Sequence, residues 1–170
     1  MKNRLFKGIG LLLVLAVLCT VSAFADDTVR IGSAAELAAL GGKELTGKIE
    51  LTQDIDMTDV AMEPITSFVG EFNGNGYTVK NLTISAELAE NYTTKGAALF
   101  ATFSGKAHDV AFENPSITLT KGQNVGTAVL CGVVGEDGVT IENVGIVGGS
   151  VSIEATKTTY AGGLIGYSQR

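Results

Sequence analysis

Short runs in which hydrophobic and polar residues alternate dominate the chain from residue 49 onward. The first such run is Ile49–Met57, and alternation of this kind is typical of a strand with one buried face. Later runs are short, rich in Val, Ile and Thr, and separated by Gly and Asn, as strands and tight turns usually are. The pattern therefore predicts an all-β region over residues 49–170.

A different pattern precedes these strands, in a segment that we assign to residues 26–48. Ser33 and Glu36 have the spacing of a helix capping box, the next four residues are apolar, and Gly41-Gly42 follows as a stop signal. These features predict one short amphipathic helix from Ser33 to Leu40. We expect this N-terminal segment to cap the region that follows.

Two short patterns recur in the second half of the chain. One is a run of small residues that contains a leucine, and the matched leucines lie 31 and 34 residues apart: Leu99, Leu130 and Leu164. The other is a strand-like element with one Asn or Asp: Asn81, Asp109 and Asn143. A period in this range indicates a repeat architecture. Because hairpin signals are scarce, we predict parallel strands that stack into a solenoid, with the leucines in an inward row. The Asn and Asp side chains tolerate left-handed backbone and should form a ladder at one corner.

The first 25 residues carry the features of a secretory signal peptide. Lys2, Arg4 and Lys7 form a basic start, an apolar stretch follows, and Ala23-Phe24-Ala25 provides a cleavage site. The apolar stretch is shorter than the ~20 residues of a membrane-spanning helix. We therefore expect cleavage after Ala25, a mature chain without a membrane span, and a secreted or cell-surface location.

Composition narrows the range of partners and reactive groups. Removal of the three basic residues of the signal peptide changes the formal charge from −6 to −9, which disfavours binding to nucleic acid. The mature chain keeps one cysteine, Cys131, so it contains no internal disulfide. Cys131 lies in an apolar run, where an inert buried thiol is the expected state.

Few residues are candidates for chemistry. His108 is the only histidine, and its place in the repeat, matched to Lys80 and Glu142, predicts solvated surface. Asp54, Asp56 and Asp59 are weak candidates for calcium ligands, because two carboxylates project from one side of an alternating strand. Solubilising surface charge is the alternative. The sequence contains no HExxH motif and no cysteine pair that would indicate zinc, and we expect no cofactor and no catalytic residue.

The run Phe68–Leu82, with Asp54–Met57, Pro64-Ile65 and Gly163–Gly166, resembles the GLUG-type repeat proteins. These are exported bacterial surface proteins, and the resemblance extends from about Ile31 to Tyr167. It implies a right-handed parallel β-helix. GLUG repeats are also found attached to immunoglobulin-cleaving metallopeptidases, in which the repeats themselves are not catalytic.

These features lead us to expect a non-enzymatic surface module that serves as a scaffold, stalk or adhesin and contacts a glycan or a host or cell-surface protein. The alternatives are part of a carbohydrate-active β-helix enzyme and a peptidase-associated repeat module. The last repeat begins near Ala161 and no terminal cap follows. We therefore expect either the N-terminal part of a longer repeat protein or a short solenoid whose open end associates with a partner or another copy.

Overall fold

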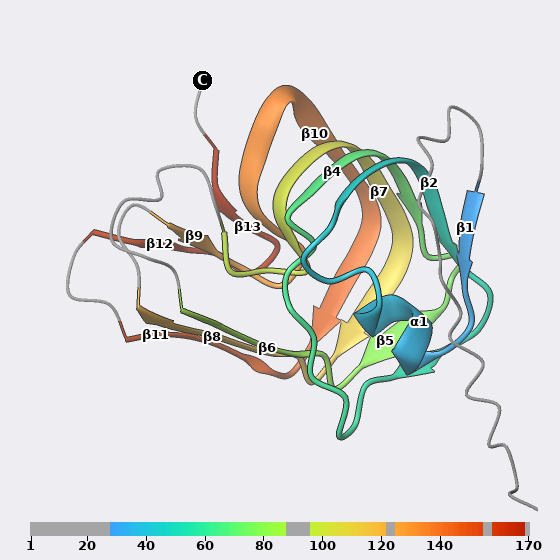
Figure 1. Ribbon diagram of the computed structural model, residues 1–170, viewed down its shortest axis with the longest axis horizontal. Helices are drawn as coiled ribbons and strands as arrows, with labels where there is room; N and C mark the ends of the chain where they lie inside the picture. The colour runs from blue at the N-terminus through green and yellow to red at the C-terminus, as the bar shows by residue number, and fades with distance from the viewer. Residues whose placement is uncertain (1–27, 88–95, 122–124, 155–157, 169–170) are drawn as a thin grey trace, which may run out of the picture.

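The computed structural model describes residues 28–87, 96–121, 125–154 and 158–168. The expected signal peptide and its cleavage site after Ala25 lie outside the described residues. Among those residues the protein consists of parallel β-sheets and one short helix, so the predicted all-β class is confirmed (Figure 1).

The strands form three sheets, and every strand pair among the described residues is parallel. The largest sheet has the order β1-β2-β4-β7-β10-β13, and the short strands β3 and β5 pair beside this path. Its strands are β1 (Thr28–Ile31), β2 (Glu44–Leu51), β3 (Ile55–Asp56), β4 (Ser67–Asn73), β5 (Thr78–Lys80), β7 (Phe100–Glu113), β10 (Cys131–Val147) and β13 (Ile165–Tyr167). The second sheet contains β6 (Thr83–Glu87), β8 (Ser116–Lys121) and β11 (Ser150–Ile153). The third contains β9 (Gly126–Thr127) and β12 (Tyr160–Ala161).

From β7 onward the chain visits the three sheets in a fixed order. It runs through β7, β8 and β9, then through β10, β11 and β12, and returns to the first sheet in β13. Each strand therefore pairs with the strand at the same stage of the preceding pass. In Figure 1 the strands β2, β4, β7 and β10 follow one another as similar curved ribbons.

The N-terminal segment differs in detail from the prediction. It contributes β1, which pairs with β2, and the boundary expected between residues 48 and 49 falls inside β2. The helix α1 (Ala34–Ala38) begins where predicted, with the Ser33 hydroxyl accepting a hydrogen bond from the Glu36 amide at 3.3 Å. Glu36 in turn accepts from the Gly32 amide at 2.7 Å. The predicted strand Ile49–Met57 is divided, because regular pairing stops at Leu51 and resumes at Ile55.

Phenylalanines fill the centre of the core. Phe68 on β4 and Phe103 on β7 are register partners, and their parallel rings have centroids 5.6 Å apart. Phe100 stacks on both of them, at 5.1 and 4.9 Å, and meets the edge of Phe72 at 5.4 Å. All four side chains are fully buried, so these aromatic contacts join successive strands along the stack.

Glycines form a column where the long strands bend. Gly47, Gly70 and Gly105 are register partners on β2, β4 and β7, and all three have positive φ angles, of 96°, 151° and 121°. A Cβ atom on Gly70 would lie 1.9 Å from the Gly47 carbonyl oxygen. The bend therefore requires residues without side chains at this position in three adjacent strands.

Candidate functional site

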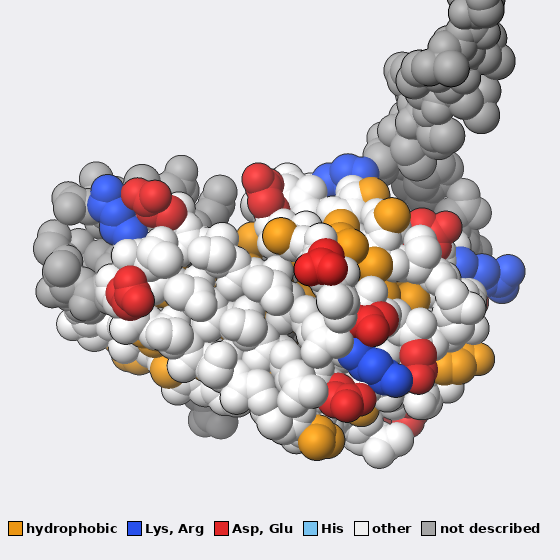
Figure 2. Space-filling view, turned by 90° about the horizontal axis from the view of Figure 1, so that it is seen from below, with side chains coloured by type: hydrophobic (Ala, Val, Ile, Leu, Met, Phe, Trp, Pro, Cys, Tyr) orange, Lys and Arg blue, Asp and Glu red, His pale blue; other side chains and the backbone are white. Residues whose placement is uncertain are grey.

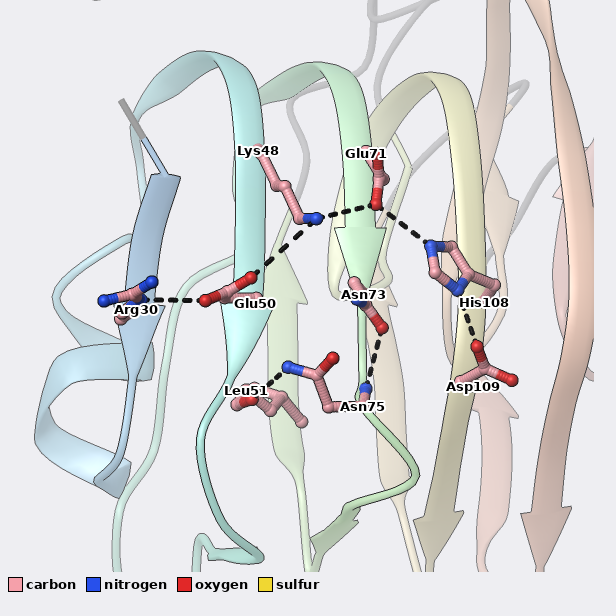
Figure 3. Close-up of polar contacts among 9 residues, drawn as sticks. All are labelled: Arg30, Lys48, Glu50, Leu51, Glu71, Asn73, Asn75, His108 and Asp109. Atoms are coloured by element: carbon pink, nitrogen blue, oxygen red, sulfur yellow. Dashed lines mark hydrogen bonds and ion pairs between the residues drawn. The ribbon is translucent and has the colours of Figure 1, made fainter. Parts of the chain in front are cut away.

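A row of charged side chains crosses the outer face of the large sheet from β1 to β7 (Figure 3). Arg30 on β1 pairs with Glu50 on β2 at 2.8 Å, and Lys48 lies between Glu50 and Glu71 at 3.8 and 3.1 Å. Glu71 on β4 then contacts His108 on β7. Because parallel register places these residues on neighbouring strands, unlike charges alternate along the row and tie the strands together.

His108 closes this row between two carboxylates. Its Nδ1 lies 2.8 Å from an Asp109 oxygen and its Nε2 lies 3.1 Å from a Glu71 oxygen. The hydrogen bond to Asp109 raises the pKa of His108, and the bond to Glu71 adds to this effect, whereas partial burial opposes it. His108 also lowers the pKa of Glu71, since the charged carboxylate is the form it stabilises.

The prediction that His108 is solvated surface was wrong. Only 16% of its side chain is exposed, and its register partners are Asn73 and Glu142 rather than Lys80 and Glu142. Lys80 instead pairs with Glu113, five residues further along β7. Matching the repeats by residue type had shifted the first element by this distance.

The same shift separates the three predicted corner residues into two columns. Asp109 and Asn143 occupy equivalent positions, and the Asn143 side-chain amide donates to Asp109 at 2.7 Å. Asn81 lies in another column, beside Asn114, because its backbone amide donates to the Glu113 carbonyl. Its side-chain amide donates to Asp56 at 3.0 Å. The single ladder predicted for Asn81, Asp109 and Asn143 is therefore wrong, although each of them has the positive φ expected of a corner, between 50° and 55°.

Two of the three candidate calcium ligands, Asp54 and Asp56, are engaged in other contacts. Asp54 accepts a hydrogen bond from the Thr78 amide at 3.0 Å, which lowers its pKa, and pairs with Lys80 at 3.4 Å. Hydrogen bonds from Asn81, and then from Thr58, lower the pKa of Asp56 to about 2. Asp59 lies on an exposed turn at a φ of 60°. No group of three or more His, Cys, Asp or Glu side chains suited to a metal ion occurs in the part of the chain that the structure describes.

The three matched leucines occupy one column, with Leu99 and Leu130 inside the core and Leu164 packed against it. Phe100, Cys131 and Ile165 are register partners, so Leu99, Leu130 and Leu164, each one residue earlier, also follow one another along the stack. The first two are fully buried and Leu164 is half-buried. Cys131 is itself fully buried, and desolvation raises the pKa of its thiol to about 12. This thiol is therefore protonated and inert at neutral pH.

The second sheet presents a face of hydroxyl groups that we did not predict. On each of the three strands, two outward-facing positions that are two residues apart carry Ser or Thr. One row is Thr83, Ser116 and Ser150, and the other is Ser85, Thr118 and Ser152. Residues between them, such as Ile84 and Ile117, are fully buried. The signal in the sequence was the alternation of Ser and Thr with aliphatic residues in each run.

This hydroxyl face is neutral and regular. In parallel strand geometry, neighbouring residues within a row are about 4.8 Å apart, and the two rows are about 6.6 Å apart along the strands. Figure 2 shows the surface over β6, β8 and β11 as a broad area with few charged or hydrophobic side chains. Of the six hydroxyls, only that of Thr83 makes a hydrogen bond within the described residues, to the Asn81 carbonyl at 3.3 Å. The other five are available to a ligand or to water.

A shallow pocket of about 260 Å³ lies beside one end of this face. Two carboxylates, those of Glu63 and Glu87, line it together with Thr66 and Ser85. Glu87 also pairs with Lys121 at 3.5 Å. Nothing in the spacing of these residues along the sequence indicated that they would meet.

Comparisons with known proteins give one partial similarity. No family model matches the chain, and no solved structure matches it. A stretch of 104 residues, 61% of the chain, is 32% identical to part of halomucin from Haloquadratum walsbyi. The chain spans about 1% of the length of halomucin. Across the described ranges we find no helix with the length and apolar character needed to span a membrane.

Proposed function

We propose that the chain is an exported, non-enzymatic surface module built as a right-handed parallel β-helix with α1 as its N-terminal cap. The repeated order of visits to three parallel sheets supports this fold, as does the resemblance to GLUG-type repeats. The similarity to a stretch of halomucin is compatible with a surface location. Mass spectrometry of extracellular protein should find Asp26 as the first residue.

The observation that carries the binding role is the hydroxyl face of β6, β8 and β11. Each Ser or Thr hydroxyl can donate one hydrogen bond and accept others, which matches the hydroxyl groups of a neutral glycan. Repeat proteins bind through extended faces of this kind. The charged row on the large sheet, by contrast, is engaged in contacts between its own strands. We therefore propose that the module binds an extended, uncharged glycan chain.

Glycan-array binding of residues 26–170 tests this role. We expect binding to neutral polysaccharides that the double variant Ser85→Ala/Thr118→Ala weakens, because both hydroxyls lie at adjacent positions of the face. Thr46→Ala, at an exposed position on β2, is the matched control and should bind like the wild type. Binding that survives the double variant, or that is confined to proteins, would contradict the glycan proposal.

The pocket beside the hydroxyl face favours one alternative, a carbohydrate-active enzyme. Most glycoside hydrolases use two carboxylates that flank the scissile bond, and Glu63 and Glu87 line a common pocket. Depolymerisation of a polysaccharide that is lost in both Glu63→Gln and Glu87→Gln would establish this alternative. The peptidase-associated module rests on the GLUG resemblance alone, and the gene sequence beyond Arg170 tests it through the presence of an HExxH motif.

A further inference from the structure

The pocket beside the hydroxyl face lies at the end of one of its two rows. Ser152, Thr118 and Ser85 are register partners on β11, β8 and β6, the neighbouring strands of the second sheet (Figure 1). Ser85 also lines the pocket. The row therefore leads from β11 across the sheet to the pocket, and one ligand chain can contact both.

Glu63 takes the next place in this row. A parallel bridge joins Ala61 to Thr83, and the Met62 amide donates to the Thr83 carbonyl at 3.4 Å. Glu63 and Ser85 each follow one of the two bridge partners by two residues, and both line the pocket. Because side chains two residues apart point to the same side of a strand, a carboxylate succeeds the three hydroxyls at the pocket.

The polar groups of the pocket are available to a ligand. Within the described ranges, the Glu63 carboxylate and the hydroxyls of Thr66 and Ser85 make no hydrogen bond or ion pair. The second carboxylate of the pocket, that of Glu87, is paired only with Lys121, at 3.5 Å, and its side chain is 69% exposed. The pocket thus offers hydroxyl donors together with strong acceptors, which is the set that the hydroxyls of a sugar ring require.

The size and walls of the pocket suit the last sugar of a chain. Its volume of about 260 Å³ is below the roughly 300–1,000 Å³ of sites that hold drug-sized ligands, and leaves room for one sugar ring. Beyond Glu63 the wall is formed by Gly42, whose amide donates to the Pro64 carbonyl at 2.9 Å. A chain that follows the row from β11 therefore ends in the pocket.

We propose that the pocket is a terminal subsite, which takes the uncharged end sugar of the glycan chain and excludes an acidic one. This proposal rests on the glycan-binding role of the hydroxyl face proposed above. Hydroxyls of the end sugar donate to the Glu63 carboxylate, and hydrogen bonds to a charged acceptor are roughly twice as strong as those to a neutral one. A terminal uronic acid would instead bring a third carboxylate beside Glu63 and Glu87 and be repelled.

Isothermal titration calorimetry of residues 26–170 with linear hexamers of glucose, galactose and mannose tests this proposal. Each neutral hexamer is compared with two acidic counterparts, one with a carboxylate on the first sugar and one with a carboxylate on the last. We expect a neutral hexamer that binds to be matched by one of its acidic counterparts, whereas the other binds about tenfold more weakly at low salt. Only a site that holds one end of the chain distinguishes the two counterparts.

Glu63→Gln removes the charge and keeps the size of the side chain, and Glu63 lies at an exposed position, so the fold should be retained. We expect this variant to bind the disfavoured counterpart within about threefold of the neutral hexamer, because less repulsion remains. Glu136→Gln is the matched control, since Glu136 is also exposed but lies on β10, outside the pocket. It should keep the tenfold difference, and circular dichroism should show that both variants are folded.

Equal affinity of the wild type for the two acidic counterparts would overturn the terminal subsite and leave the glycan-binding role intact. A tenfold difference that persists in Glu63→Gln would do the same. Failure of every neutral hexamer to bind, together with the absence of any signal on the glycan array, would refute the glycan-binding role and the subsite with it.

Discussion

Replacement of Gly70 by alanine tests the glycine column directly. Gly70 has a φ of 151°, which L-residues rarely adopt, and its Cα faces the backbone of Gly47 on the preceding strand. An alanine Cβ would lie 1.9 Å from the Gly47 carbonyl oxygen, 2.8 Å from its carbonyl carbon and 3.0 Å from its nitrogen. All three are backbone atoms in a paired strand, so no side chain can rotate away to make room.

The expected cost follows from two separate effects. The unfavourable backbone conformation costs an alanine about 1–3 kcal/mol. Displacing one backbone from another inside a paired sheet costs a further amount of about 1–3 kcal/mol, as overpacking does elsewhere. The free energy of unfolding should therefore fall by about 2–6 kcal/mol, and the melting temperature by about 6–18 °C for a domain of this size.

Thermal melting followed by circular dichroism provides the assay, with two further glycine variants as controls. Gly76 has a φ of 82°, but no atom lies within 4 Å of the position that a Cβ would take, so Gly76→Ala isolates the conformational cost. Gly145 has neither a positive φ nor a close contact, so Gly145→Ala should melt like the wild type. The expected order of stability is Gly145→Ala, then Gly76→Ala, then Gly70→Ala. If the Gly70 variant melted with the Gly76 variant, the contact with Gly47 would carry no cost and the reasoning would be refuted.

Three further predictions concern single residues. Leu130→Asp buries a carboxylate at a fully buried position and should unfold the domain at room temperature, whereas a melting point within a few degrees of the wild type would contradict the burial of Leu130. The raised pKa of His108 means that folding takes up a proton, so its contribution to stability is complete below about pH 6.5 and is lost as pH rises through the raised pKa. As the pH is raised through this range, the melting temperature of the wild type should fall, and that of His108→Gln should change less. Cys131 should react with iodoacetamide only after unfolding, because burial raises the pKa of its thiol to about 12, and rapid alkylation of the native protein would show that this site is open.

The predictions from sequence succeeded where one residue type has one structural role. Alternation of apolar residues identified Ile49, Leu51, Ile55 and Met57 as inward-facing, and all four are buried. The repeat of small residues around leucine likewise located three positions in one column, of which Leu99 and Leu130 are fully buried. The capping pattern at Ser33 marked the start of a helix, since a local hydrogen bond determines it.

The errors arose where one residue type serves two positions. Asparagine occupies two different corners, so Asn81 was matched to Asp109 when its neighbour in the stack is Asn114. The glycine column was missed because Gly47, Gly70 and Gly105 are separated by unequal lengths of chain, which conceals their common role. The burial of His108 was missed because its contact with Glu71 depends on the register between β4 and β7.

The stacking of parallel strands also determines the order in which the structure should open. Strands β4 and β7 are paired on both sides, while the last pass, β11 to β13, ends in short strands with half-exposed residues. Among the described strands, β4 and β7 should therefore open last, which amide hydrogen exchange would record as stronger protection there than in β11 to β13. A protease that cuts only opened backbone should for the same reason cleave β11 to β13 well before β4 and β7.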